Sequence, residues 1–146
     1  MTSMWRTCGW VLLGSALILA LSLGVRHGFG LFLSPMSAQF GWGREVFAFA
    51  IALQNLIWGL AQPFTGALAD RFGAAKVVLV GGVLYAVGLV CMGLSDSAMT
   101  LSLSAGLLIG IGLSGTSFSV ILGVVGRAVP PEKRSMGMGI ASAAGS

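Results

Sequence analysis

The sequence predicts an all-α integral membrane protein, and two observations carry this prediction. Hydrophobic residues make up 56% of the 146 residues and charged residues only 8%, whereas a soluble domain carries roughly a quarter charged residues. The apolar residues also gather in runs of about 20, the length that a helix needs to cross a bilayer. Charged residues this scarce cannot cover the surface of a water-soluble protein. The apolar runs are therefore expected to lie in lipid.

Four of these runs are long enough to span a membrane, and a fifth is incomplete. The expected spans cover about 10–33, 46–68, 77–94 and 100–126, and residues 135–146 begin a further one. Pro35 is expected to end the first helix, because proline interrupts the helical hydrogen-bond ladder, with residues 34–44 as the link that follows. A span cannot stop inside hydrocarbon with unpaired carbonyl groups. We therefore expect the chain to be a fragment of a longer protein.

The basic residues lie almost entirely on one side of the expected membrane. If the spans alternate in direction, six bases share one side: Arg6, Arg71, Lys76, Arg127, Lys133 and Arg134. Arg44 alone falls on the other side, and Arg26 lies within the first span. Because cytoplasmic loops carry an excess of Lys and Arg, the N-terminus is expected to be cytoplasmic.

Polar residues inside the spans are the candidate binding residues. A base near the bilayer centre costs roughly 2.5–3.5 kcal/mol on insertion scales, and no acidic residue of the chain is expected at the depth of Arg26. Arg26 therefore either extends to the outer interface or lines a polar cavity and meets an anion. His27 points about 100° away from Arg26, so it serves either packing and hydrogen bonding or proton relay. Gln54 and Asn55, in the middle of the second span, bond either a substrate or another helix.

Small residues form stripes along two of the expected helices, since positions three, four or seven apart share one face. The stripe on the second span consists of Asn55, Gly59, Gln62 and Gly66. The stripe on the fourth span consists of Gly112, Gly115, Ser119, Gly123 and Gly126. Small residues let helix backbones approach closely where no hydrophobic force joins them, so we expect these glycines to form packing seams.

The most distinctive stretch is the link between the second and third spans. It has the pattern G-x-x-x-D-R-x-G-x-x-K, made by Gly66, Asp70, Arg71, Gly73 and Lys76. Gly73 permits a tight turn because glycine tolerates a positive φ angle, and Gly66 lets the second helix pack closely on a neighbour. The two bases hold the link on the cytoplasmic side.

This link resembles the signature loop between the second and third spans of the major facilitator superfamily. Ala74 and Ala75 stand where that family often has further bases. The resemblance implies a twelve-helix fold, in which residues 1–146 form part of the N-terminal six-helix half. It also implies that Asp70 pairs with charges and a helix N-terminus on the cytoplasmic face, which latches the outward-facing state.

Within the superfamily, residues 40–45 are similar to the Gly-Trp-Ser-Arg link of monocarboxylate and oxalate/formate-type porters, with Gly43 in place of the serine. The arginine that drug/proton antiporters bury in the fourth span is not present between Thr100 and Gly126. The resemblance implies a secondary active transporter that works by alternating access. We expect its substrate to be a small organic anion such as a monocarboxylate, because Arg26 supplies the intramembrane positive charge.

Two alternatives are a small four-span transporter that dimerises and a non-transporting membrane scaffold or sensor. An enzyme is not expected, because the chain has one histidine, no clustered acids, no metal-ligand spacing and no nucleophile elbow. We expect no metal and no cofactor, and no nucleic acid partner, since the bases sit in short links. The expected partners are the small solute, the lipid bilayer and the remaining half of the same protein, in the inner membrane of a bacterium.

Overall fold

The computed structural model describes the backbone of residues 2–146 and the side chains from Arg6 onward. Every regular element in this described part is helical, which confirms the predicted fold class. In chain order the elements are α1 (Thr2–His27), α2 (Gly30–Phe40), α3 (Arg44–Phe72), α4 (Ala74–Gly93), α5 (Ala98–Leu101), the π-helix η1 (Ser102–Leu108), α6 (Ile109–Gly115), α7 (Phe118–Ala128), the 3-10 helix η2 (Pro131–Lys133) and α8 (Arg134–Ala144).

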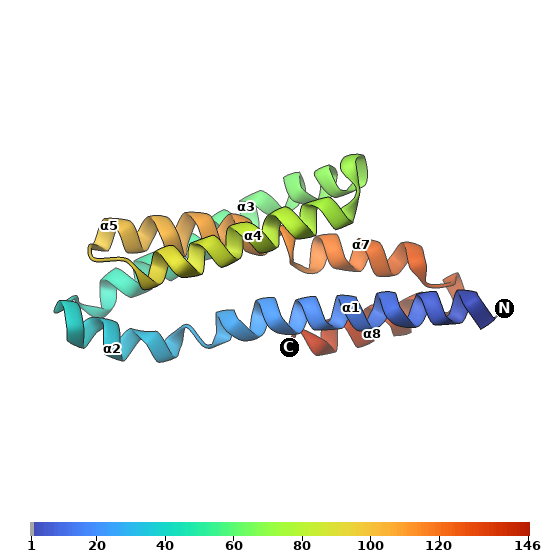
Figure 1. Ribbon diagram of the computed structural model, residues 1–146, viewed down its shortest axis with the longest axis horizontal. Helices are drawn as coiled ribbons and strands as arrows, with labels where there is room; N and C mark the ends of the chain where they lie inside the picture. The colour runs from blue at the N-terminus through green and yellow to red at the C-terminus, as the bar shows by residue number, and fades with distance from the viewer. Residues whose placement is uncertain (1) are drawn as a thin grey trace.

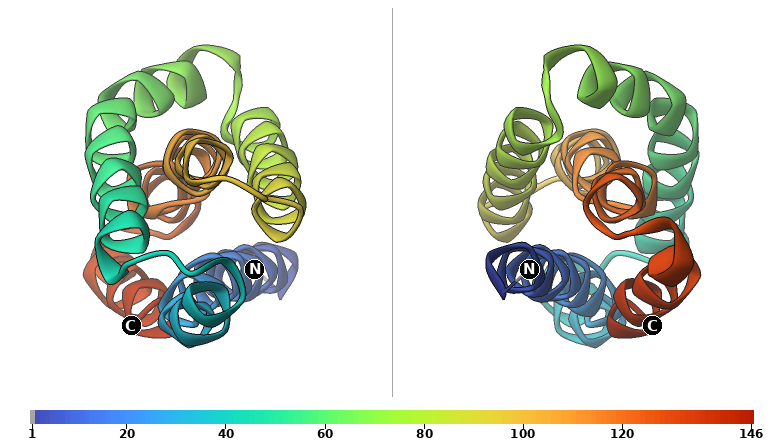
Figure 2. Two further views of the ribbon diagram at one scale, coloured as in Figure 1. Left: turned by 90° about the vertical axis from the view of Figure 1, so that its left-hand side faces the viewer. Right: turned by 90° about the vertical axis from the view of Figure 1, so that its right-hand side faces the viewer.

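Four helical stretches of the described chain are long and apolar enough to cross a membrane: Arg6–Phe40, Arg44–Phe72, Ala74–Gly93 and Ala98–Ala128. They run lengthwise through the molecule, as Figure 1 shows. The fourth stretch is the most enclosed, with 61% of its most apolar window buried against 28% or less in the other three. Seen end-on in Figure 2, this stretch begins, in yellow and orange, inside a ring of the other helices.

The first stretch differs from the prediction in where it breaks and where it ends. α1 ends at His27 and α2 begins at Gly30, and Pro35 lies inside α2. The expectation that Pro35 ends the helix is therefore wrong. In hydrocarbon, neighbouring groups and local adjustments satisfy the backbone that a proline frees, so the helix continues past it. α2 ends instead at Phe40, and the next residue, Gly41, caps it with a φ of 66° and an N–H that donates to the Ser37 carbonyl.

α3 and α4 are joined by a single non-helical residue, Gly73. Its φ is 96°, a value that favours glycine, which confirms the turn predicted there. The non-helical link is shorter than predicted, because Asp70 and Arg71 lie in the last turn of α3 and Lys76 lies in the first turn of α4. One residue with a positive φ reverses the chain, so no longer loop is needed.

The fourth stretch is divided, whereas the sequence predicted one uniform helix over residues 100–126. It widens into the π-helix η1, continues as α6 and restarts as α7 after Thr116 and Ser117. Hydroxyl groups accompany both irregularities. Ser104 Oγ donates to the Thr100 carbonyl at 2.8 Å, and Ser117 Oγ donates to the Ser114 carbonyl at 3.0 Å. Such side-chain bonds compete with the helical ladder, which explains the changes of pitch.

α4 and α6 approach closely along a seam of glycines. A Cβ atom at Gly81 would lie 2.9 Å from both the Gly112 carbonyl oxygen and the Gly115 Cα atom. The packing role predicted for Gly112 and Gly115 is therefore confirmed. For Gly59 and Gly66 the packing role stays a prediction, because a Cβ atom at either would meet nothing within 4 Å among the described residues. The face of α3 that carries these two glycines is uncovered by the described residues.

One end of the bundle gathers the basic residues, and we call it the basic end. Figure 1 places the N-terminus, the α3–α4 turn and the α7–α8 connection there. These segments carry Arg6, Arg71, Lys76, Arg127, Lys133 and Arg134. The α2–α3 and α4–α5 connections lie at the opposite end. The alternation of the spans thus collects the six bases as the sequence suggested.

Candidate functional site

A polar cluster lies midway along the bundle, where α1 faces α3. Arg26 of α1 donates from Nη2 to the Oδ1 atom of Asn55, and its Cζ atom lies 4.8 Å from the ring centroid of Trp58. Trp58 is the middle residue of α3, and Asn55 precedes it by three residues, so both share one helix face. These contacts hold the half-buried Arg26 side chain against α3.

Gln54 and Tyr85 extend the cluster to the neighbouring helices. Gln54 is fully buried, and its Nε2 donates to the Ala105 carbonyl in η1 at 2.8 Å. Tyr85 of α4 donates its O–H to the Ser22 carbonyl in α1 at 2.9 Å. Side-chain bonds of this kind join helices in a membrane. Of the two uses left open for Gln54, its amide nitrogen serves the contact with another helix.

Three buried polar atoms have no hydrogen-bond partner among the described residues, and all three belong to this cluster. They are Arg26 Nε, Gln54 Oε1 and Trp58 Nε1. Most buried polar atoms in proteins are bonded, and leaving one unbonded costs about 1–3 kcal/mol. Because the unbonded atoms are concentrated in one place, the cluster is the candidate binding site.

His27 does not join the cluster, although it neighbours Arg26 in sequence. It is the last residue of α1 and its side chain is exposed. Adjacent residues of a helix point about 100° apart, which accounts for the separation. Of the four residues predicted to bind substrate, the structure joins Arg26 to Asn55, binds Gln54 to Ala105 beside them and leaves His27 exposed.

An ion pair lies at the basic end. Asp70 Oδ1 accepts a hydrogen bond from Arg127 Nη1 at 2.7 Å, which joins the end of α3 to the end of α7. The Asp70 and Arg127 side chains are 71% and 57% exposed. An ion pair this exposed contributes about 0–1 kcal/mol. The family resemblance implied that Asp70 pairs with nearby charges, and Arg127 is such a charge.

The other residues of the signature loop lie on the surface of the basic end. The Arg71 Cζ atom is 5.3 Å from the ring centroid of Phe72. Lys76 borders an apolar groove of about 300 Å³ between α3, α4 and α6. These two bases thus contact the protein through apolar neighbours and keep their charge at the end of the bundle.

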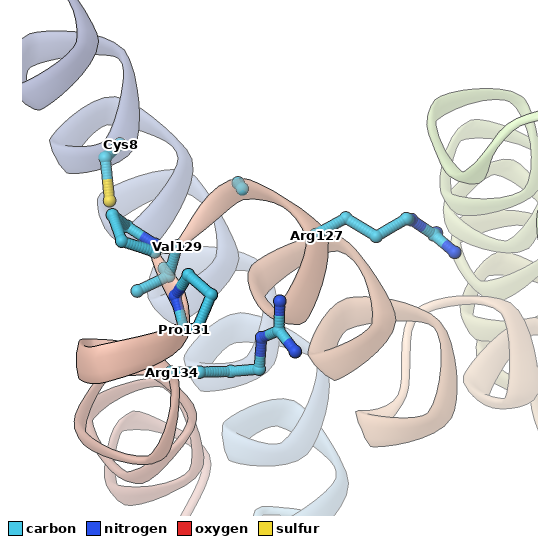
Figure 3. A pocket seen from close by; sticks show the side chains of 7 residues that line it. Cys8, Arg127, Val129, Pro131 and Arg134 are labelled. Carbon is cyan, nitrogen blue, oxygen red and sulfur yellow. The ribbon is translucent and has the colours of Figure 1, made fainter.

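A separate pocket of about 310 Å³ opens at the same end. Its lining consists of Cys8, Arg127, Ala128, Val129, Pro130, Pro131 and Arg134. Figure 3 shows the Arg127 side chain extending away from this pocket, in agreement with its bond to Asp70. The pocket therefore takes its positive charge chiefly from Arg134.

The polar cluster offers a guanidinium cation and unbonded N–H donors, which together attract a carboxylate through charge-assisted hydrogen bonds. Its acceptors are the amide oxygens of Gln54 and Asn55. Within the described part of the chain, no group of three or more His, Cys, Asp or Glu side chains could hold a metal ion. The groups present at mid-bundle are thus one guanidinium cation, N–H donors and two amide oxygens.

Sequence reasoning missed two residues that the structure brings into these sites. Trp58 follows Gln54 by four residues and Asn55 by three, so helical spacing alone could have placed it on their face. Arg127 pairs with Asp70 across 57 residues of sequence. The only sequence signal for that pair was that both were expected on the same side of the membrane.

A sequence profile described as Major Facilitator Superfamily matches residues 5–146, nearly the whole chain. The chain belongs to the major facilitator superfamily. The family predicted from the loop between α3 and α4 is therefore confirmed, and with it membership in a family of membrane transporters. The four apolar helical stretches fit the N-terminal part of that fold.

Curated relatives of this superfamily chain match much of its length. Monocarboxylate transporter 11 of Mus musculus is 34% identical over 134 residues, which cover 91% of this chain and 30% of the relative. The uncharacterized MFS-type transporter YhjX of Escherichia coli is 30% identical over 109 residues, which cover 75% of this chain and 27% of the relative. Multidrug resistance protein MdtH of Proteus mirabilis is 39% identical over 66 residues, which cover 45% of this chain and 16% of the relative. The chain thus spans less than a third of the length of these relatives.

Proposed function

We propose that the chain forms the first four spans and the beginning of the fifth in a twelve-span secondary active transporter, which moves a small organic anion by alternating access. The observation that carries this proposal is the setting of Arg26. Asn55 and Trp58 hold this cation at mid-bundle, and its Nε–H is buried without an acceptor among the described residues. An organic anion supplies both the opposite charge and the acceptor.

The distribution of acidic residues supports an anionic substrate. The acids of the chain lie at or near helix ends: Glu45, Asp70, Asp96 and Glu132. A cation in the membrane normally faces a wet cavity or a partner of opposite charge, and Arg26 pairs with no carboxylate of the described residues. A relative that matches 91% of the chain is named a monocarboxylate transporter, which agrees with a carboxylate as that partner.

The positions of the two sites support alternating access. Transporters of this kind hold substrate near the bilayer midplane and move one part against another around it. The polar cluster lies at mid-bundle, and the weak Asp70–Arg127 pair lies at the basic end, where it can open and close. We place that end on the cytoplasmic side of a bacterial inner membrane, because it carries the excess of bases.

Uptake by the full-length protein in proteoliposomes tests this function. We expect saturable uptake of labelled small carboxylates, with formate, oxalate and lactate as the probes, and no saturable uptake of a neutral sugar. Tetraphenylphosphonium, an organic cation, is the opposing probe, and protein-free vesicles are the control. Uptake of the cation without uptake of any carboxylate would show that the anionic substrate is wrong and that the multidrug relative is the better guide.

Replacing Asp70 with asparagine is expected to slow turnover and to shift the protein towards the inward-facing state. Asparagine keeps the shape of the side chain but removes the charge that pairs with Arg127. Because an exposed pair contributes at most about 1 kcal/mol, the shift in populations is expected to be no more than about fivefold. Maleimide labelling of cysteines introduced at the basic end measures it.

The matched control for this experiment is Asp96→Asn, which removes an exposed carboxylate from the α4–α5 connection at the opposite end. This variant should label at the rate of the wild-type protein. Equal labelling rates for Asp70→Asn and Asp96→Asn would contradict a role of Asp70 as a latch.

A further inference from the structure

Trp58 is the residue of the polar cluster whose arrangement is least explained by packing. Its side chain is half-buried, and the guanidinium of Arg26 lies over its ring at 4.8 Å. The Nε1 atom is buried and unbonded among the described residues. A buried indole N–H normally finds an acceptor, so this donor has a hydrogen bond that the described residues leave unmade.

An amide side chain one turn away on α3 makes its hydrogen bond to another helix. Gln54 precedes Trp58 by four residues on the same face of α3, and its Oε1 atom is also buried and unbonded. Gln54 directs its amide nitrogen to the Ala105 carbonyl in η1. The helix contact made by Gln54 thus leaves the Trp58 N–H without an internal partner.

We propose that Trp58 is a ligand-binding residue, whose indole N–H and the Nε–H of Arg26 form a pair of donors for the two oxygens of one carboxylate. This inference rests on the proposed function and names the second contact of the same site. Asn55 already accepts from Arg26 Nη2, which leaves Nε as the donor without a bond.

The spacing of the two groups suits a single carboxylate. Nε is bonded to the Cζ atom of Arg26, and Nε1 is a member of the Trp58 ring, so the 4.8 Å approach keeps both donors within reach of one small ligand. A pair of N–H donors, one of them charged, is also what a carboxylate with two oxygens accepts. Trp58 therefore has two roles: its ring face orients Arg26, and its edge binds the ligand.

Substituting Trp58 with phenylalanine separates these roles in the full-length protein. Phenylalanine keeps an aromatic face for Arg26 and removes the N–H. Loss of one hydrogen bond to a charged group should raise KM for the carboxylate transported by the wild type about tenfold or more. We expect kcat to change by less than about twofold, because a contact that only binds the ligand affects KM and leaves kcat unchanged. Trp10→Phe is the control, since Trp10 is 70% exposed on α1.

A second replacement removes the N–H without changing the size of the ring system. Benzothienylalanine, introduced at position 58 by nonsense suppression, carries sulfur in place of the indole N–H. A similar rise in KM with this residue supports the proposal even where the phenylalanine variant folds poorly. A KM within about twofold of wild type for the benzothienylalanine protein would overturn it, since the donor is then dispensable.

The experiments distinguish failure of the role of Trp58 from failure of the proposed carboxylate transport. If the wild type transports a carboxylate and Arg26→Gln does not, but removal of the Trp58 N–H leaves KM unchanged, the proposed function stands and the role of Trp58 is wrong. If the wild type binds and transports no carboxylate, both proposals are wrong.

Discussion

Replacing Arg26 with glutamine abolishes saturable carboxylate uptake, on our proposal, while the protein still inserts into the membrane. Glutamine keeps a polar side chain that can bond Asn55, but it removes the charge and the Nε–H donor. Loss of a charge-assisted contact in a low-dielectric site contributes about 1.5–3 kcal/mol for each bond. Because the Nε–H bond and the positive charge are lost together, we expect the upper end of this range, about 3 kcal/mol, and a fall in kcat/KM for uptake of about a hundredfold.

Two variants make this experiment specific for the position and the geometry of the charge. Arg44→Gln removes a base at the opposite end of the bundle, in the first residue of α3, and should leave uptake within about twofold of wild type. Arg26→Lys keeps the charge but loses the planar guanidinium that lies over Trp58. We expect intermediate uptake for the lysine variant. Unchanged uptake kinetics in Arg26→Gln would contradict the role of this residue.

Replacing Gly112 with valine is expected to prevent the bundle from assembling. A Cβ atom at this position would lie 2.7 Å from the backbone nitrogen of Tyr85 and 2.9 Å from the carbonyl oxygen of Gly81. Backbone atoms cannot move aside as a flexible side chain does, so α4 and α6 would have to separate. We expect a loss of stability at or above the upper end of the usual overpacking range, about 3 kcal/mol.

Size-exclusion chromatography of the detergent-solubilised full-length protein, with heating, measures this effect. Gly82→Val is the matched control, because it lies next to Gly81 on α4 and its Cβ atom would meet nothing within 4 Å. The control should elute and melt like the wild type, whereas Gly112→Val should aggregate or melt well below it. Similar melting temperatures for the two variants would show that the α4–α6 seam is looser than described.

The helical membrane fold could be predicted from composition because lipid imposes a simple constraint. In hydrocarbon the backbone must satisfy its own hydrogen bonds, so long apolar runs form helices. The interruptions were harder to predict, since they depend on local competition. Pro35 was expected to end a helix and does not, whereas Thr116 and Ser117 do interrupt one. Hydroxyl groups that bond the backbone leave no distinctive pattern in an apolar sequence.

The candidate binding site was predicted in part. Arg26, Gln54 and Asn55 were chosen because polar residues are rare and costly inside a membrane. That criterion cannot identify Trp58, because tryptophan counts as an apolar residue in a spanning helix. It also could not decide the direction of the Gln54 amide, which depends on the Ala105 carbonyl 51 residues away. Contacts between helices decide such details, and a single sequence does not contain them.

The single-residue turn at Gly73 limits how this half of the molecule can move. With no spare backbone between α3 and α4, the ends of these two helices cannot separate at the basic end. Arg26 lies on another helix, in the last turn of α1, just before the interruption between α1 and α2. α1 is tied to both helices, because Tyr85 of α4 bonds the Ser22 carbonyl of α1 and Arg26 of α1 bonds Asn55 of α3. On the proposed function, we therefore expect α1, α3 and α4 to move together against the rest of the protein.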